Sequence, residues 1–499
     1  MSKHVVIVGG GLGGLSAGVA CAQTGCSVTL IEKQNRTGGY AVSFSRGGFT
    51  FDPSLHAAPA AGRGGPFDLL MHELGIARNI NFLKINKGFH ARLGSFAFQI
   101  PVEYRDLLDA LSAAFPLQRK GLAAFGADLL RFAPLYYDTV EGLLSPFAVA
   151  TRFVPRVPSF LYHAGTSTHS YLSRFISDPV LLALLYHPAI FYGIPMRRFP
   201  AVNFMIMFYL LCVKGMYTIK GGGSALTSAL DDRLRRLGAK IVTGSEVTRI
   251  RIVRGRAMAV ETRDGQTIAA DGIIANVNTP HLIHNLVGDG NIPARYGKAL
   301  ARLKPSLSMV QLHLGLDCPL MSTGLSSHIT TIFPDADLDT CLRSRDTDVA
   351  PKGFSIIAPT ATDESAAPVG KTVLSVLGGV SSEKWTSLSD NDYRNEKKKC
   401  TDAVLETLFA QYPSVKSHCA VVDCATPRTF QRYTNNPGGA ILGFDCSLGM
   451  HRTIMKVSCL PIRNLYLASA WTDRLGGFMQ VVKAGITAAR KCIKEIDGR

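Results

Sequence analysis

The sequence predicts an α/β fold in which a parallel-sheet domain, built to hold a dinucleotide, is interrupted by a second domain of helices and strands. Two observations predict it. A glycine-rich loop at residues 9–14 lies between a short apolar strand and a helix at the start of the chain. Strand patterns of the same kind return at residues 271–276 and 464–472, far along the sequence. One sheet assembled from distant segments explains both.

The N-terminal segment carries the pattern GxGxxG in the context that it requires. Residues 4–8 form an apolar strand, residues 15–23 have a helical pattern, and the loop between them contains Gly9, Gly10, Gly11, Gly13 and Gly14. The first glycine permits a tight turn, the second lets the backbone approach a pyrophosphate, and the last lets helix and strand pack closely. The segment is therefore expected to be a Rossmann unit.

A second strand, residues 27–31, ends in Glu32, about 20 residues after the glycines. A carboxylate at this point accepts hydrogen bonds from the hydroxyl groups of a ribose and disfavours the 2′-phosphate of NADP. The motif does not separate FAD from NAD.

The residues after Glu32 carry a resemblance to a known group of enzymes. Lys33, a polar turn with Arg36, and the doublet Gly38 and Gly39 precede the hairpin-like sequence GGFTFD at residues 47–52. This arrangement resembles the second phosphate-side motif of FAD enzymes that include amine oxidases and carotenoid desaturases. Those families commonly carry an arginine after the doublet. Tyr40 stands there in this chain, so Lys33 or Arg36 is expected to supply the cation.

The resemblance extends to the C-terminus. Val247 matches the position at which these enzymes pass a backbone across the adenine. Residues 464–472 and the following helix resemble the last flavin motif, whose helix N-terminus faces the edge of the flavin where negative charge accumulates on reduction. The resemblance implies that four residues here bind the cofactor: Ala470, Asp473, Gly477 and Met479. Amine oxidases usually carry Gly-Asp where this chain has Ser-Ala, whereas the alanine resembles bacterial phytoene desaturases.

The chain thus resembles, from residue 4 to about residue 492, the FAD-dependent carotenoid desaturase, carotenoid isomerase and retinol saturase family, a phytoene desaturase-like branch of the amine-oxidase-like flavoprotein superfamily. The resemblance implies a GR2-type flavoprotein: a Rossmann-like FAD-binding domain with an inserted α+β substrate domain. Residues 1–90, 215–290 and 420–499 are expected to form the first, and residues 91–214 and 291–419 the substrate-binding and helical domain. FAD is expected to be non-covalent, because no Cys or His in the C-terminal glycine-rich motif resembles a flavin tether.

The segments between the flavin motifs are rich in aromatic and aliphatic residues and poor in charge, which suits an elongated, lipophilic substrate. Any single stretch also fits an ordinary hydrophobic core. With the resemblance, they predict an oxidoreductase acting on carbon–carbon bonds of an isoprenoid, through hydride transfer at flavin N5. Two alternatives remain: an amine or protoporphyrinogen-type flavin oxidase, and a non-enzymatic prenyl or lipid carrier of the same fold.

His56 is the candidate catalytic residue. It lies four residues after Asp52, at the end of the GGFTFD segment, where retinol saturases look similar. The ordinary pKa of a histidine makes it usable as an acid or a base near neutrality. A hydrogen-bonded structural histidine is the alternative.

The charge balance points to an anionic partner. The net charge is +17, which suits an anionic membrane surface or an acidic cofactor, although an ordinary solvated basic surface also fits. No zinc-ligand spacing or nucleic-acid motif accompanies it, so neither a metal nor a nucleic acid is expected. Residues 201–213 are apolar but too short to cross a bilayer. Eleven cysteines without regular spacing, and no signal sequence, favour a cytoplasmic protein. The basic charge and a lipophilic substrate favour peripheral membrane association. The oligomeric state is left open.

Overall fold

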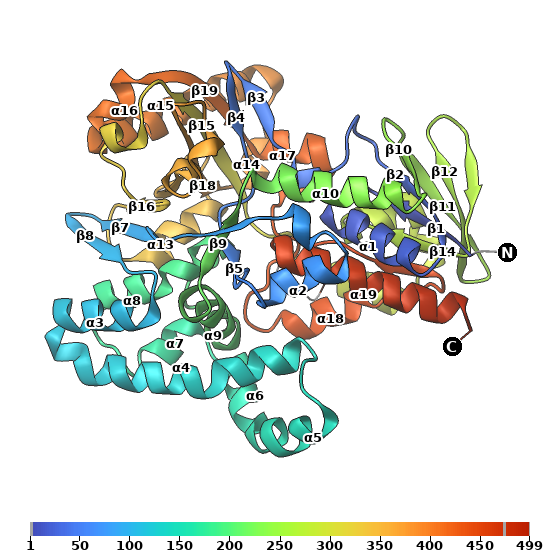
Figure 1. Ribbon diagram of the computed structural model, residues 1–499, viewed down its shortest axis with the longest axis horizontal. Helices are drawn as coiled ribbons and strands as arrows, with labels where there is room; N and C mark the ends of the chain where they lie inside the picture. Colours follow the sequence, from blue (N-terminus) through green and yellow to red (C-terminus); the bar gives the residue numbers. More distant parts are fainter. Residues whose placement is uncertain (1–2, 473–475, 499) are drawn as a thin grey trace.

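Five parallel strands, gathered from distant parts of the chain, form the sheet that carries the glycine-rich loop. The computed structural model describes residues 3–472 and 476–498. In it the strand order is β10 (Lys240–Val242), β2 (Ser27–Ile31), β1 (His4–Val8), β14 (Gly272–Ala275) and β20 (Leu465–Leu467), as Figure 1 shows in part. Both faces of the sheet are covered, which explains why its strands are almost continuously apolar. The predicted α/β class is confirmed.

Two helices from opposite ends of the chain cover one face of this sheet. Helices α1 (Leu12–Gln23) and α19 (Phe478–Ile496) lie side by side (Figure 1). Small residues allow the close approach: a Cβ atom on Gly485 would lie 2.2 Å from Ser16 Oγ and 2.3 Å from Gly13 O. The N-terminal and C-terminal segments therefore form one structural unit.

An antiparallel meander covers the opposite face of the parallel sheet. Its strands are β11 (Val247–Val253), β12 (Arg256–Thr262) and β13 (Thr267–Ala269). Val247, Ile250 and Val260 pack against apolar residues of β1 and β14. Burial alternates along β11, since Ile250 is buried and Arg249 and Arg251 are exposed.

A mixed sheet of seven strands forms the second layered unit. Its order is β19 (Cys419–Ala425), β15 (Ser308–Leu316), β18 (Thr372–Val380), β17 (Phe354–Ile357), β16 (Ile329–Phe333), β7 (Phe89–Leu93) and β8 (Phe96–Ile100), and only the β16–β7 pair is parallel. One face packs against α15 (Asp390–Gln411) and Trp385. The other face turns toward the main core, so residues that alternate along β15 face different surroundings.

Helices fill the space on the core side of the seven-stranded sheet. They are α3 (Tyr104–Ala114), α4 (Arg119–Val140), α6 (Val157–Gly165), α7 (Thr168–Leu172), α8 (Pro179–Tyr186) and α9 (Ala201–Phe208). Helix α9 and the π-helical segment Tyr209–Val213 that follows it are largely buried, so this apolar stretch is a core element. Across the described residues, no helix combines the length and the apolar character that a bilayer crossing requires.

The remaining elements join the two sheets. Strands β3 (Phe44–Arg46) and β4 (Phe49–Phe51) form a hairpin, and β5 (Ala58–Pro59), β9 (Met216–Ile219) and β6 (Phe82–Lys84) form a small sheet. Helices α2 (Pro66–Glu73), α10 (Gly222–Arg236) and α18 (His451–Ser458) flank the parallel sheet (Figure 1). The expected domain division stays a prediction. All five parallel strands fall within residues 1–90, 215–290 and 420–499, while β7 and β19 begin at two of the expected boundaries.

Replacing Gly13 by alanine should destabilise the protein. The new Cβ would lie 1.7 Å from the backbone oxygen of Ala468, and a backbone atom in a packed strand end cannot rotate away. We expect the free energy of unfolding to fall by about 1–3 kcal/mol or more, measured by chemical denaturation of the cofactor-free protein. Gly290→Ala is the matched control, because no atom lies within 4 Å of its new Cβ. Equal stability of the two variants would contradict the close approach.

Candidate functional site

Three distant segments meet at the carboxyl end of β1. Gly9 closes the turn after the strand with φ +95°, a left-handed conformation that favours glycine. The segments are the glycine loop, Asn276 directly after β14, and Ala468 directly after β20. The side-chain amide of Asn276 lies between the other two. In the orientation that satisfies both of its atoms, its oxygen accepts a hydrogen bond from Gly11 N at 2.9 Å and its nitrogen donates to Ala468 O at 2.8 Å. One side chain thus ties the glycine loop to the end of β20.

The five glycines of the loop divide into two groups. Gly9 and Gly11 line a large cavity, whereas Gly10, Gly13 and Gly14 serve the packing around it. Gly10 N donates a hydrogen bond of 2.7 Å to Glu32 Oε2. A Cβ atom on Gly14 would lie 2.0 Å from Gly9 O, so this glycine lets the helix begin directly against the strand. The roles expected for the first and last glycines fit this geometry.

Glu32 is buried and lines the cavity between β2 and β11. Its Oε2 accepts from Gly10 N, and its Oε1 accepts from Gln34 N at 2.8 Å. A carboxylate can accept about four hydrogen bonds, so capacity remains for the hydroxyl groups of a ligand. Val247, the first residue of β11, lines the cavity close by. The arrangement suits the ribose contact expected from the sequence.

Cations stand at the same end of the cavity. Arg36 is exposed at the cavity wall, and within the described part of the chain it forms no ion pair. Lys33 is half-buried and donates a hydrogen bond of 2.8 Å to Asn435 Oδ1, and burial lowers its pKa. Both lie beside Gly38 and Gly39, whose backbone follows the glycine loop through the hydrogen bond from Gly38 N to Gly10 O. This end therefore offers positive charge and close backbone approach to an anionic group.

Tyr40 occupies the position of the missing arginine without replacing its charge. Its hydroxyl donates a hydrogen bond of 3.0 Å to Ala440 O, and its ring contacts Phe430 with 6.0 Å between the ring centroids. Burial raises the pKa of Tyr40 to about 12, so the hydroxyl stays neutral near pH 7. Tyr40 lines the cavity and, through these two contacts, connects the cavity wall to the segment before β20.

The N-terminus of α19 also faces the cavity. Gly477 has φ +89° and leads the chain into the helix, and Gly477, Phe478 and Met479 all line the cavity. Among the described residues no side chain caps this helix, and the positive end of its dipole lies at the cavity. Ala470 also lines the cavity. Asp473, the remaining residue expected here, lies outside the described residues.

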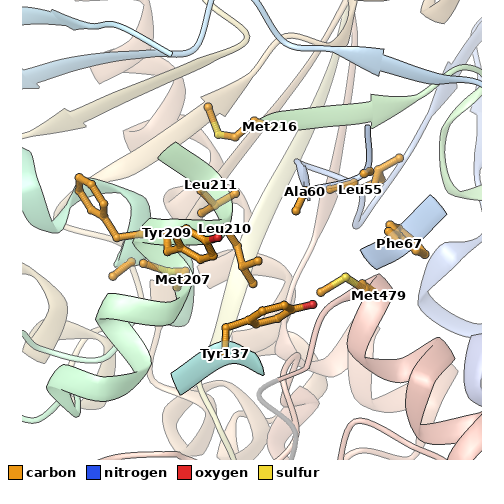
Figure 2. Close-up of a cluster of buried hydrophobic side chains, with 14 of the residues drawn as sticks. Leu55, Ala60, Phe67, Tyr137, Met207, Tyr209, Leu210, Leu211, Met216 and Met479 are labelled. Atoms are coloured by element: carbon orange, nitrogen blue, oxygen red, sulfur yellow. The ribbon is translucent and has the colours of Figure 1, made fainter. Parts of the chain in front are cut away.

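The site is one continuous cavity of about 1840 Å³. It is larger than the roughly 300–1,000 Å³ of ordinary ligand pockets, so it has room for a dinucleotide and a second elongated ligand. Beyond the charged end its walls are apolar. Figure 2 shows side chains from several elements converging there, among them Leu55, Met207, Leu210, Leu211, Met216 and Met479.

A few neutral polar groups interrupt the apolar wall. Gln311 and His313 face the cavity from alternate positions of β15, and both are buried. Among the described residues, neither polar atom of the Gln311 side chain has a hydrogen-bond partner. His313 Nδ1 pairs with Ser375 Oγ at 3.0 Å. Because a buried polar group without a partner costs about 1–3 kcal/mol, this part of the wall is built to contact a ligand or water.

His56 lines the cavity, as its candidate role requires, but its pKa differs from the expected one. Its ring stacks on Phe191, with 5.9 Å between ring centroids, and its backbone oxygen accepts a hydrogen bond of 3.0 Å from His328 Nε2. Burial, with smaller contributions from His328 and His313, lowers the pKa of His56 to about 4. The imidazole is therefore neutral near pH 7. It can accept a proton or share a hydrogen bond, but it does not store a proton for donation.

Sequence reasoning missed Asn276, Gln311 and His313. The last two come from SMVQLHLGL, a strand whose polar residues recur at every second position among aliphatic ones. That alternation was a usable signal, since residues two apart in a strand share a face.

Asp52 proves to be structural: its carboxylate accepts hydrogen bonds from the backbone of Ser54, Leu55 and Gly223.

Comparison with known proteins agrees with this geometry. Residues 12–493 match the family described as flavin-containing amine oxidoreductase. A 4,4'-diapolycopene oxygenase from Methylomonas sp is 25% identical, over 99% of each chain. A chloroplastic prolycopene isomerase from Daucus carota is 22% identical, over 87% of this chain and 71% of its own. An all-trans-retinol 13,14-reductase from Danio rerio is 24% identical, over 93% and 81%.

Solved structures share the fold. A putrescine oxidase variant superposes with a TM-score of 0.67 at 16% identity, covering 99% of both chains. The resemblance to carotenoid and retinoid flavoenzymes that the sequence motifs predicted is confirmed by the relatives, and the fold by this structure. With nearly its whole length matched, the chain belongs to the family of flavin-containing amine oxidoreductases.

Proposed function

We propose that this flavoenzyme holds FAD non-covalently and acts on carbon–carbon bonds of a hydrophobic isoprenoid, a carotenoid or a retinoid, as a desaturase, saturase or isomerase. The observation that carries the proposal is the single cavity, which joins a charged, glycine-lined end to an apolar end without a wall between them. Names of the relatives, which include a carotenoid oxygenase, a carotenoid isomerase and a retinol reductase, support the substrate class.

The charged end fits the adenosine and pyrophosphate parts of FAD. Glu32 would bind the ribose, the Gly11 backbone and Arg36 would meet the pyrophosphate, and Val247 would lie along the adenine. The N-terminus of α19, with the positive end of the helix dipole, would face the flavin ring where negative charge develops. FAD, when bound, supplies a hydride acceptor or donor at N5.

Residues of the chain would bind the substrate, exclude water and transfer the proton. Phe191, Met207 and Leu210 hold a polyene against the flavin end and exclude water from it. His56 lines the cavity on the segment that follows Tyr40 and Asp52. In our proposal its neutral imidazole accepts or relays the proton that accompanies hydride transfer.

A product profile tests the substrate class. The gene is expressed in a host that makes several carotenoids and retinoids, and the products are separated by chromatography with absorption detection. We expect one polyene to change its number or geometry of double bonds. Hydrogen peroxide production with amines, and no altered polyene, would favour an amine oxidase instead. Colourless purified protein that takes up no FAD would favour the lipid carrier.

The proposal includes peripheral association with a membrane. The substrate partitions into lipid, and a net charge of +17 attracts the protein to an anionic surface. Vesicle flotation should therefore be greater on anionic than on neutral lipid and should fall as salt rises, because salt screens the attraction. Equal flotation on both lipids would contradict an electrostatic contribution.

FAD binding should depend on Gly11 and Arg36. In Gly11→Val even the Cβ atom would lie 2.6 Å from the Asn276 amide, and the branched side chain would prevent the close approach of a pyrophosphate to the backbone, so we expect no measurable FAD binding. Arg36→Gln removes an unpaired cation and should weaken FAD binding about tenfold or more, since hydrogen bonds to charged groups contribute about 1.5–3 kcal/mol. Titration calorimetry measures both. Arg302→Gln, an exposed arginine outside the cavity lining, is the control.

FAD should be released by acid precipitation, and colour that stays with the pellet would contradict non-covalent binding.

Turnover should depend on His56. His56→Asn keeps a hydrogen-bonding side chain but cannot exchange a proton, so kcat should fall about 10²- to 10⁴-fold with FAD content and thermal stability retained. Because burial lowers the pKa of His56 to about 4, the imidazole is deprotonated from pH 5.5 to pH 8, and kcat/KM should show no His56-dependent inflection there. An inflection near pH 6.5 that the Asn variant lacks would contradict the buried environment. Near-normal turnover would make His56 structural.

A further inference from the structure

One lobe of the protein exposes apolar side chains that a soluble surface ordinarily hides. It comprises residues 142–165 and includes α5 (Pro146–Ala148), the segments Val149–Phe153 and Val154–Arg156, and α6. Figure 1 shows α5 and α6 projecting beyond α4 at the edge of the molecule. The exposed apolar side chains of the lobe are Leu143 (60%), Phe147 (77%), Val154 (55%), Leu161 (56%) and Tyr162 (47%).

The charge of the lobe has one sign. Residues 142–165 contain no Asp or Glu, and their cations are Arg152 and Arg156. Arg152 is exposed, and neither arginine has an ion pair among the described residues. The nearest acid along the chain, Glu141, forms an ion pair with Lys483. Apolar side chains beside unpaired arginines are the combination with which interfacial segments meet anionic lipid.

The same lobe forms part of the cavity wall. Phe160 and Ala164 line the cavity, and Phe160 packs on Tyr136 of α4 and on Phe153 within the lobe. Its outer side chains are thus exposed, while its inner side chains border the apolar part of the site. An occupant of the outer surface would lie close to the substrate cavity.

We propose that residues 142–165 are the surface through which the protein docks on an anionic lipid bilayer, with Leu143 and Phe147 at the boundary between headgroups and acyl chains. This rests on the proposed membrane association and names the lobe responsible for it. Docking there places the cavity wall at the bilayer, so a lipophilic substrate reaches the site without crossing bulk water.

Vesicle flotation of a lobe variant tests the docking surface. The double variant Leu143→Glu, Phe147→Glu introduces acids at two exposed positions, so the fold should not change. On vesicles of phosphatidylcholine and phosphatidylserine in equal parts, we expect its bound fraction to fall about tenfold or more relative to the wild type. Met321→Glu with Val369→Glu is the matched control, since these side chains are 71% and 103% exposed but lie outside the lobe. The control should bind like the wild type.

Two further variants separate the apolar and electrostatic contributions. Phe147→Trp keeps an aromatic ring suited to the membrane interface and should retain binding. Arg152→Gln with Arg156→Gln should reduce binding to the anionic vesicles while leaving binding to pure phosphatidylcholine unchanged. Circular dichroism and FAD content, measured on every variant, show that the fold and the cofactor site are intact.

Three outcomes would overturn the inference, and they are distinguishable. If the Leu143→Glu, Phe147→Glu variant floats like the wild type, membrane association stands but the lobe does not cause it. If the wild type itself fails to float, both the association and its docking surface are wrong, while the proposed flavin chemistry is untouched. If flotation is unchanged and sedimentation shows that the variant turns a wild-type dimer into a monomer, the lobe binds a second copy of the chain.

Discussion

The site depends on the close approach of three distant chain segments at the carboxyl end of β1. Gly13 meets the backbone of Ala468 at a distance that admits no Cβ atom, and the Asn276 amide connects Gly11 to the same carbonyl. These contacts fix the end of β20, the strand that precedes α19 in the sequence. The glycines are thus needed as much for the assembly of the C-terminal motif as for the approach of a phosphate.

The continuity of the cavity follows from the way in which the two large sheets share the chain. The chain passes twice from the parallel sheet to the seven-stranded sheet and back, so both sheets contribute residues to the same cavity. Met309, Gln311 and His313 of β15 therefore face the same space as Tyr40 and His56. The polar groups that β15 presents to a lipophilic ligand there are neutral, which suits a polyene better than a charged amine.

Local motifs could be predicted from the sequence, and long-range environments could not. The GxGxxG loop and Glu32 were found from short-range spacing, and Gly9, Gly11, Glu32 and Val247 line one cavity, while their roles in cofactor binding stay predictions. The pKa of His56 depends on burial by Phe191 and on two histidines from β15 and the start of β16, more than 250 residues away. Gln311 looked like an ordinary strand residue, because its missing partners are visible only in three dimensions. The exposure of Phe147 was equally hidden, since an apolar run has the same sequence whether buried or exposed.

The most direct test of the account records the absorption of the flavin and of the polyene in the same sample. FAD-loaded protein is mixed without oxygen with retinol or a carotenoid in vesicles, and the flavin and polyene absorption bands are followed together. The measurement is made with oxidised flavin and, in parallel, with flavin reduced beforehand by dithionite. The account predicts that a polyene band shifts in one of the two mixtures, in a reaction that requires bound FAD and is lost in Gly11→Val. The flavin bleaches if it takes hydride from the polyene, regains its oxidised bands if it gives hydride to the polyene, and is unchanged after a redox-neutral isomerisation. Unchanged polyene bands across the carotenoids and retinoids, together with bleaching by an amine, would contradict it.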